Sequence, residues 1–381
     1  MNARSIGTTL FFYLGLALVF MPFLRQNTLY LPLLFLAAWG TRKLALAGEH
    51  NPAFSRVREQ VDRFFIERKR PVVALLLAAA VAVPFVSTNY LIDIFTSAIL
   101  YAILATALNI TVGMTGVLVL GFIGFYAIGA YTTGILTAKF HLCGFWTALP
   151  LSGLSAMLFG LLLGIPTLRL KGDYLAIVTL GFGEIVKIFL NNLDRYTGGP
   201  NGILGIKKPV LFGWGIDTLP SFYWFCLLCL AAEIVVVARI FASRYGRAWV
   251  AVRENEMAAS ALGIDVFRRH LLSFSLSAFF GGCAGSLFAV KQGFISPDSF
   301  TFLESVMVLC MVVLGGIGTI AGAVAGAFLL VVVPEFLREF ALYRMLIFGA
   351  VMIAFMIYHP HGLFGSRAIT LEQEDRLDGG E

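Results

Sequence analysis

The clearest shortage in this 381-residue sequence is charge, because Asp, Glu, Lys and Arg together make up only 13% of it. Hydrophobic residues make up 59%, and the mean hydropathy is +0.86. A soluble globular domain is roughly a quarter charged and about half apolar. The chain therefore has more apolar surface than one water-soluble core can bury, and its composition excludes an ordinary soluble protein.

The sequence also lacks the motifs of soluble enzymes. It contains no Gly-Lys pair, so it has no phosphate-binding loop of the G-x-x-x-x-G-K-[ST] type for ATP. H-E-x-x-H and G-x-S-x-G are absent as well. The five histidines lie at the ends of apolar segments or between them, and the five cysteines lie in or beside such segments, as small packing residues do. We therefore expect neither a catalytic site nor a cofactor or metal bound by this chain.

Long apolar runs recur along almost the whole sequence, and about 20 residues of helix cross the hydrocarbon layer of a bilayer. The alternation expected of barrel strands is not sustained anywhere. We therefore predict an all-α fold, a polytopic transmembrane helix bundle of about 10–12 spans. The expected spans are 7–24, 29–47, 71–86, 91–112, 116–137, 146–165, 174–193, 221–240, 270–290, 301–316, 319–337 and 342–358.

Lys and Arg are shared unequally between the two sides that these spans define. The side of the amino terminus receives 19 of them and the other side receives 8, while Lys187 falls inside a span. Because positive residues concentrate on the cytoplasmic side of membrane proteins, we expect both termini and residues 243–269 to be cytoplasmic. The net charge of +6 follows from this asymmetry and implies no nucleic-acid partner.

Three regions are expected along the chain. Residues 1–70 form an N-terminal extension of two spans and an amphipathic helix, which lies either in the lipid interface or against a partner subunit. Residues 71–365 form the main transmembrane domain. Residues 366–381 are acidic and lack an apolar pattern, so we expect them to be disordered.

One charged segment of 27 residues, 243–269, separates two apolar spans. Its Ala-rich part, residues 248–262, favours one or two short helices. Gly246 and Gly263 bracket this part, and Gly263 suits a left-handed helix cap. Small side chains would let the backbone of another protein approach closely, and they belong to Ala258, Ala259 and Ala261. The segment is therefore either a docking surface for another protein or a plain cytoplasmic linker.

Ionisable residues inside expected spans are functional candidates, because an isolated charge is costly in lipid. Glu184 and Lys187 lie one helical turn apart, and Glu233 lies deep in the following span. They either line a polar path, where a carboxylate could meet a substrate ammonium, or include a structural Glu184–Lys187 pair between helices. The structural pair is the simpler interpretation.

Glycines supply the remaining candidates. Gly113, Gly116 and Gly121 could interrupt a helix so that free amide and carbonyl groups meet a polar solute near the middle of the membrane. The spacing of Gly318, Gly322 and Gly326 instead favours close helix packing. The residues expected to line a substrate path are Gly113, Thr115, Gly116, Gly121, Gly181, Gly183 and Glu184.

The sequence AASALG at 258–263 resembles the A-A-x-x-x-G core of the coupling loop in bacterial ABC importer permeases. Met257 stands where the acidic residue of that motif usually is, and Glu256 lies one position earlier. The surrounding block, GRAWVAVRENEMAASALGIDVFRRHLLSFSLSAFFGGCAGSLFA, resembles that of branched-chain amino-acid permeases of the LivM type. So do LRLKGDYLAIVTLGFGEIVKIFLNN, TGGPNGI, GFISPDSFTFLESVMVLCMVVLGGIGTIAGAVAGA and HPHGLFG. The resemblance extends over residues 91–365.

This resemblance implies a permease subunit of an ATP-driven importer for branched-chain, hydrophobic amino acids in the inner membrane of a bacterium. A second homologous permease would complete the translocation path, and a periplasmic substrate-binding protein would deliver the solute. Two ATP-binding subunits would carry the ATP and Mg. The residues that the resemblance places against an ATP-binding subunit are Arg247, Arg253, Glu254, Asn255, Glu256, Ala258, Ala259 and Gly263.

One block departs from the family pattern. Family members often have G-Q-L-S-L-G-H where this chain has GVLVLGF at 116–122, so that Val117, Val119 and Phe122 replace three polar residues. If those positions line the path, the path is more apolar or the substrate differs, and a permease for urea or short-chain amides is an alternative. Two further alternatives are a carrier driven by an ion gradient and an intramembrane enzyme. The sparse buried charges disfavour the carrier, and the lack of a nucleophile or metal cluster disfavours the enzyme.

Overall fold

The computed structural model of the chain describes residues 80–85, 87–168, 170, 172–211, 214–336 and 349. By its internal contacts the chain divides into two units, Met1–Val81 and Ala82–Glu381, and nearly all described residues belong to the second. The spans expected at 7–24 and 29–47, all but one residue of 342–358 and most of 71–86 fall outside the described residues. So do the amphipathic helix and the acidic tail.

Helices build almost all of the described part of the second unit. They are α5 (Asn89–Thr115), α6 (Ile123–Gly134), α7 (Phe145–Thr167), α8 (Asp173–Asn192), α9 (Asp194–Thr197), α10 (Leu219–Ala242), α11 (Arg244–Glu254), α12 (Glu256–Ala261), α13 (Val266–Gln292), α14 (Phe302–Gly315) and α15 (Ile320–Phe336). Two short antiparallel ladders pair β1 (Ile203–Leu204) with β4 (Phe294–Ile295) and β2 (Val210–Leu211) with β3 (Trp214–Gly215). The predicted all-α bundle is confirmed.

Six helical segments in this part of the chain are long and apolar enough to cross a membrane. They are α5, α7, the Tyr174–Asn192 part of α8, α10, α13, and the segment Pro297–Gly315 that ends in α14. The helix expected over 116–137 begins at Ile123 instead of Gly116, and after α6 it continues as a π-helical turn, Ile135–Lys139. The chain leaves α5 at Gly116 with a left-handed φ of 72° and continues without helix to Phe122, so α6 has only 12 residues.

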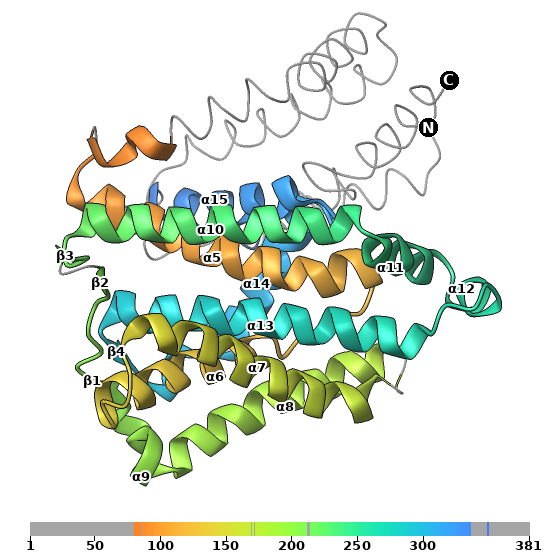
Figure 1. Cartoon of the computed structure of the whole chain (residues 1–381), viewed down its shortest axis with the longest axis horizontal. Coiled ribbons are helices and arrows are strands. Elements are labelled where there is room, and N and C mark those ends of the chain that lie inside the picture. The colour runs from red at the N-terminus through yellow and green to blue at the C-terminus, as the bar shows by residue number, and fades with distance from the viewer. Residues whose placement is uncertain are drawn as a thin grey trace, which may run out of the picture. The chain divides into compact units, whose positions relative to one another are not determined.

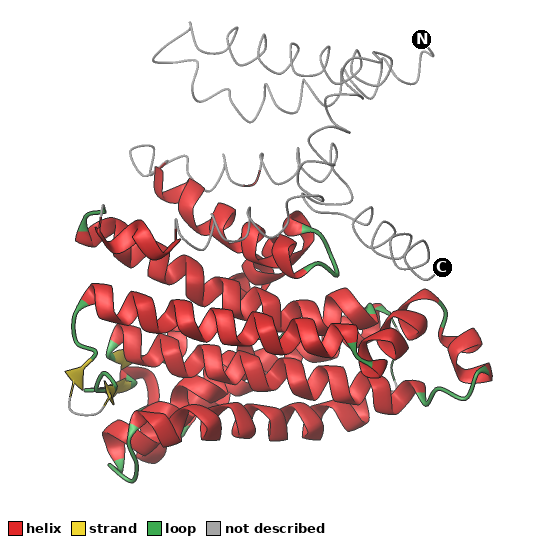
Figure 2. Cartoon of the chain, turned by 45° about the horizontal axis from the view of Figure 1, so that its top comes forward, coloured by secondary structure: helices red, strands yellow, loops and turns green. Residues whose placement is uncertain are grey.

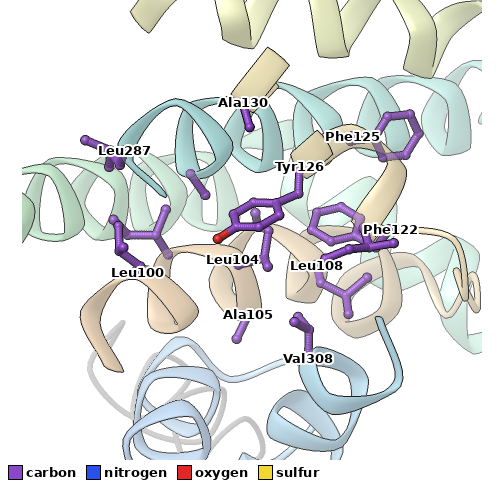
Figure 3. Packing of buried hydrophobic residues seen from close by; sticks show 14 of the residues in the cluster. Leu100, Leu104, Ala105, Leu108, Phe122, Phe125, Tyr126, Ala130, Leu287 and Val308 are labelled. Atoms are coloured by element: carbon purple, nitrogen blue, oxygen red, sulfur yellow. The ribbon is translucent and has the colours of Figure 1, made fainter. Parts of the chain in front are cut away.

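Helix α5 lies at the centre of the bundle. It contacts α10, α13, α14 and α15, and every residue from Ala102 to Thr115 is buried. A helix that is apolar on all sides is expected in such a surrounded position. Figure 3 shows Leu104 of α5 beside Tyr126 of α6, and Leu108 of α5 near Phe122 and near Val308 of α14.

Glycines allow neighbouring backbones to touch. A Cβ atom on Gly129 of α6 would lie 2.1 Å from the carbonyl oxygen of Gly282 in α13, and one on Gly326 of α15 would lie 2.0 Å from that of Met311 in α14. A Cβ on Gly322 would lie 2.5 Å from the carbonyl oxygen of Gly315. The predicted close packing at positions 322 and 326 is therefore confirmed. In lipid such contacts stabilise helix association, because burial of apolar surface adds little there.

The connections between helices gather at two ends of the bundle. Figure 1 shows α11 and α12 at one end, which we call the α12 end, and α9 with the β-strands at the other, which we call the strand end. Figure 2 shows the long helices running between them. Helix α7 starts at the strand end, where Trp146 Nε1 donates to the carbonyl oxygen of Val210, so its last residue, Thr167, lies toward the α12 end. The cytoplasmic orientation of the α12 end stays a prediction.

Candidate functional site

The charged segment folds into two short helices, α11 and α12, as predicted. Ser243 caps α11 by accepting a hydrogen bond from the amide of Tyr245, and Asn255 caps α12 by accepting one from Ala258 at 3.0 Å. These side chains satisfy amides that have no partner inside the helix. The left-handed cap expected at Gly263 is present, with φ 82°. The two helices therefore have defined ends.

Gly246 does not bracket this segment. It lies in the first turn of α11, where a Cβ atom would come within 2.1 Å of the carbonyl oxygen of Phe241 at the end of α10. The glycine therefore permits a tight joint between α10 and α11. Arg247 reinforces the same joint, because its Nη1 donates to the carbonyl oxygen of Ala242 at 3.1 Å. Glu254 lies exposed at the last position of α11.

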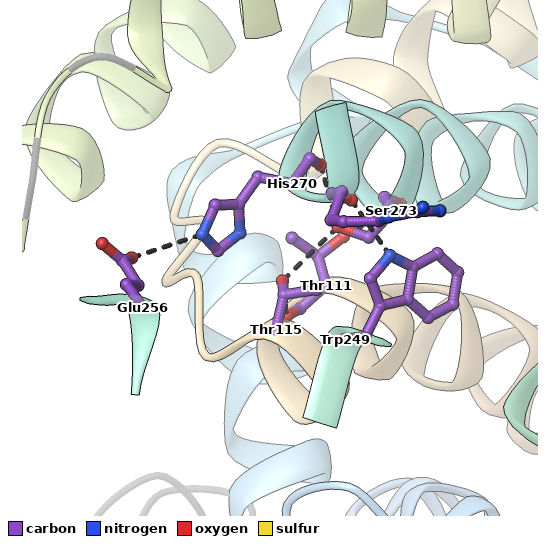
Figure 4. A network of polar contacts seen from close by, with 7 residues as sticks. Thr111, Thr115, Trp249, Glu256, His270 and Ser273 are labelled. Carbon is purple, nitrogen blue, oxygen red and sulfur yellow. Dashed lines mark hydrogen bonds and ion pairs between the residues drawn. The ribbon is translucent and has the colours of Figure 1, made fainter. Parts of the chain in front are cut away.

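Trp249 anchors α11 in the bundle. Its side chain is fully buried with Ile110 and Met114 of α5 and Val237 of α10. Its indole Nε1 donates to the carbonyl oxygen of Arg269 at 3.0 Å, which connects α11 to the start of α13 (Figure 4). A buried indole N–H needs such a partner, and this one fixes the angle of α11 against α13.

A polar chain runs from α12 to the end of α5 (Figure 4). Glu256 Oε1 lies 3.3 Å from Nε2 of the buried His270, whose carbonyl oxygen accepts from Ser273 Oγ at 2.8 Å. The carbonyl oxygen of Ser273 accepts from Thr111 Oγ1 of α5 at 3.4 Å. The hydroxyl groups of Ser273 and Thr115 lie 3.4 Å apart. Thr115 thus belongs to a network that holds α12 and α13 to α5.

The two central alanines of the segment face opposite ways. Ala259 is only 3% exposed, whereas Ala258 is exposed. Two apolar side chains project from α12 and its C-cap, since Met257 and Leu262 are 82% and 81% exposed. We call the exposed residues Met257, Ala258, Ala261 and Leu262 the α12 knob. Met257 and Leu262 lie within the stretch 253–263 that the resemblance implies as the contact, but they were not among the individually named residues.

Arg253, expected at the contact with an ATP-binding subunit, is exposed and also bonds the membrane bundle. Its Nη1 donates to the carbonyl oxygen of Gly113 in the last turn of α5, at 2.5 Å. A Cβ atom on Gly318, in the turn between α14 and α15, would lie 2.9 Å from the same Nη1. Next to this contact, Asn109 Oδ1 accepts from the amide of Gly318 at 2.9 Å, and its Nδ2 donates to the carbonyl oxygen of Thr319 at 3.1 Å.

The connection between α5 and α6 was expected to interrupt a helix, and it does so from Gly116 onward. Gly113 is not part of the interruption, because α5 continues through it. The free backbone groups of Leu120 are paired within the protein. Its amide donates to Thr179 Oγ1 of α8 at 3.1 Å, and its carbonyl oxygen accepts from Ser305 Oγ of α14.

Close packing accounts for two of the candidate path glycines. A Cβ on Gly121 would lie 1.7 Å from the carbonyl oxygen of Thr179, and one on Gly183 would lie 3.3 Å from Cα of Gly121. The three residues that depart from the family pattern are Val117, Val119 and Phe122, and all are buried in the core of this chain. Their apolar side chains therefore fit the interior of a single subunit.

The predicted Glu184–Lys187 pair is wrong. Lys187 Nζ instead lies 3.4 Å from Asp298 Oδ1 in the segment before α14. Glu184 is half-buried on a face of α8 whose exposed side chains are Tyr174, Ile177, Ile185, Ile188 and Phe189. Gly181, one turn away, has no atom near its side-chain direction within 4 Å.

Glu233 is the other carboxylate at membrane depth. It is buried in α10, and neither carboxylate oxygen has a hydrogen-bond partner among the described residues. In the same part of the chain, no group of three His, Cys, Asp or Glu side chains is arranged to hold a metal ion.

Residues 90–356 match the family model described as branched-chain amino acid transport system / permease component. The chain is 47% identical over 344 residues to the high-affinity branched-chain amino acid transport system permease protein LivM of Escherichia coli, covering 84% of this chain and 80% of the relative. The corresponding protein of Salmonella typhimurium is 47% identical over 326 residues, 80% of this chain and 76% of the relative. A probable branched-chain amino acid transport permease protein LivM of Methanocaldococcus jannaschii is 26% identical over 242 residues, 58% of this chain and 68% of the relative. No solved structure gives a significant match.

Proposed function

Because the chain belongs to the family of branched-chain amino acid transport permeases, we propose that it is a permease subunit of an ATP-driven importer for branched-chain amino acids. It lies in the inner membrane, with the α12 end and both termini in the cytoplasm. The observation that carries this proposal is the high identity to the Escherichia coli relative over most of both chains.

The importer contains further subunits. A second, homologous permease completes the translocation path, two ATP-binding subunits bind ATP and Mg, and a periplasmic protein delivers the amino acid. The sequence of this chain supports the assignment of ATP hydrolysis to other subunits, since it has no phosphate-binding loop. The chain itself is therefore a transport subunit and not the ATPase.

The α12 knob is the contact with an ATP-binding subunit. Its support is geometric, because Met257 and Leu262 expose most of their apolar surface at the tip of a helix with capped ends. Methionine is enriched at protein–protein interfaces, and the buried core of an interface is more apolar than the rest of the surface. Helix α11 and the Trp249 contacts behind the knob hold it firmly against the bundle.

The exposed face of α8 with Gly181 and Glu184 lines the path between the two permeases. A carboxylate among lipid tails is costly. Glu184 has an ionisable group on an otherwise apolar face, which favours an aqueous path or a polar partner over lipid. A carboxylate there can attract the ammonium group of an amino acid.

Reconstitution tests the proposal. The purified complex in liposomes, with ATP on the side of the ATP-binding subunits and loaded binding protein on the other, should move radiolabelled leucine, isoleucine and valine and leave urea and acetamide behind. Movement of urea without leucine would favour the amide permease. Leucine movement by this chain alone, driven by an ion gradient, would contradict the proposal altogether.

A further inference from the structure

Three segments that are far apart in sequence meet at the side chain of Arg253. They are the end of α11, the last turn of α5 with Gly113, and the turn between α14 and α15 with Gly318. Arg253 is the last but one residue of α11, directly behind α12. It therefore joins the cytoplasmic helices to two elements of the membrane bundle.

The chemistry of this contact favours a firm link. Gly113 lies in the last turn of α5, where carbonyl groups have no partner inside the helix. The C-terminal end of a helix carries partial negative charge, so a guanidinium placed there is stabilised. A hydrogen bond from a charged donor is also stronger than a neutral one. At 2.5 Å, the bond from Arg253 to Gly113 is of this kind.

The α14–α15 turn is held against the same point. Asn109 of α5 is fully buried, and its side-chain amide bonds both Gly318 and Thr319. Gly318 has a left-handed φ of 90°, and a Cβ there would lie 2.9 Å from Arg253 Nη1 and 3.2 Å from the carbonyl oxygen of Gly113. No other residue type would let this turn close against the guanidinium.

We propose that Arg253 is a positioning residue that transmits movement of α11 and α12 to α5 and to the α14–α15 turn. The inference rests on the proposed function, in which the α12 knob contacts an ATP-binding subunit. A displacement of the knob moves Arg253, and Arg253 moves the end of α5. That end leads directly into the connection whose Leu120 is bonded to α8 and α14, so the displacement reaches the proposed path.

Other contacts keep α11 and α12 in place without Arg253. Trp249 is buried between α5 and α10 and bonds Arg269, and Glu256 contacts His270 of α13. Removal of the guanidinium should therefore leave the two helices folded and attached to α13. What it removes is their link to the last turn of α5 and to Gly318.

The test compares Arg253→Ala, Arg253→Lys and the control Arg268→Ala in the complete importer. The side chain of Arg268 is 83% exposed and pairs only with Asp265 among the described residues. We expect Arg253→Ala to assemble and hydrolyse ATP at a rate near that of the unmodified complex, while leucine moved per ATP falls about tenfold. Arg253→Lys should recover part of this ratio, because an ammonium can still donate to Gly113, and Arg268→Ala should change nothing.

Three results would overturn the inference. The first is an unchanged ratio of leucine to ATP in Arg253→Ala. The second is loss of the ATP-binding subunits from this variant, which would make Arg253 a docking residue. The third is absence of both Arg253 variants from the membrane, which would make it a folding residue. Failure of the unmodified complex to move leucine, in contrast, would contradict the proposed function. The same assay distinguishes this result, because it measures the unmodified complex beside the variants.

Discussion

Gly121 has no room for a side chain. A Cβ atom there would lie 1.7 Å from the carbonyl oxygen of Thr179, which cannot move without displacing α8. Gly181 is also close to Thr179 along α8, but it has open space in the direction of its missing side chain. The two glycines therefore form a matched pair for substitution.

We expect Gly121→Ala to destabilise the protein by about 1–3 kcal/mol, the usual cost of forcing extra atoms into a packed interior. Gly181→Ala should leave stability unchanged or raise it slightly, since Ala is the better helix former. The melting temperature of the detergent-solubilised protein, followed by tryptophan fluorescence, measures both effects. Equal melting temperatures for the two variants would contradict the close contact at Gly121.

Residue-level predictions succeeded where local rules decide the outcome and failed where distant contacts do. The left-handed conformation of Gly263 follows from local backbone preference and was predicted. The partner of Lys187 was not, because Asp298 is remote in sequence and only the fold brings it near. The bond from Arg253 to Gly113 was not predicted for the same reason, since it joins two segments that are far apart in sequence.

At the scale of one element, α12 combines a well-defined helix with an exposed apolar tip. Consecutive residues of a helix point about 100° apart, so Ala258 faces outward while Ala259 packs inward. A six-residue helix is too short for sequence periodicity to reveal which alanine is buried. Substitutions at exposed and buried positions of α12 should therefore have different effects.

We expect Met257→Asp to weaken binding of the ATP-binding subunit about tenfold or more, because a charge replaces an apolar contact. The permease itself should insert and melt as before, since Met257 is exposed. Ala259→Arg should instead lower the melting temperature, because its side chain has no space. Affinity measured with the purified ATP-binding subunit, alongside melting curves, separates the two. Unchanged affinity in Met257→Asp would remove the knob from the interface.

An interruption of the helix at Gly113, Gly116 and Gly121 was predicted, but the structure starts it only at Gly116. Glycines near residue 116 indicated an interruption, and the chain does leave the helix there. The helix persists through Gly113, because that residue packs against Gly318 and Asn109 and its carbonyl group is bonded by Arg253. Sequence alone cannot distinguish a glycine that ends a helix from one that lets another backbone approach.

For the whole molecule, composition and hydrophobic runs were enough to predict a helical membrane bundle. Lipid offers no hydrogen bonds, so a spanning segment must satisfy its own backbone, and helices do so locally. The arrangement of the spans was not predictable, because apolar residues surround α5 on every side and its sequence has no outward face. Central and peripheral helices therefore looked alike.

The orientation of the molecule is open to a direct test. Met257 at the α12 end and Leu204 at the strand end, 72% exposed, suit cysteine substitution in a chain whose native Cys143 has been changed to Ser. In intact cells, a membrane-impermeant maleimide applied from outside should label Leu204→Cys and not Met257→Cys. In inside-out vesicles the pattern should reverse, because the α12 end is expected in the cytoplasm. The opposite pattern would invert the orientation.

The hydroxyl groups that bond Leu120 constrain how the transporter can open. Thr179 and Ser305 together occupy both backbone groups of that residue. Rewinding the stretch 116–122 into regular helix would break both bonds and leave the two hydroxyl groups without these partners. These two hydrogen bonds fix the backbone of the stretch to α8 and α14, so we do not expect it to act as a flexible hinge. We therefore expect opening and closing to move α5, α8 and α14 as rigid helices, with little refolding of the stretch that connects them.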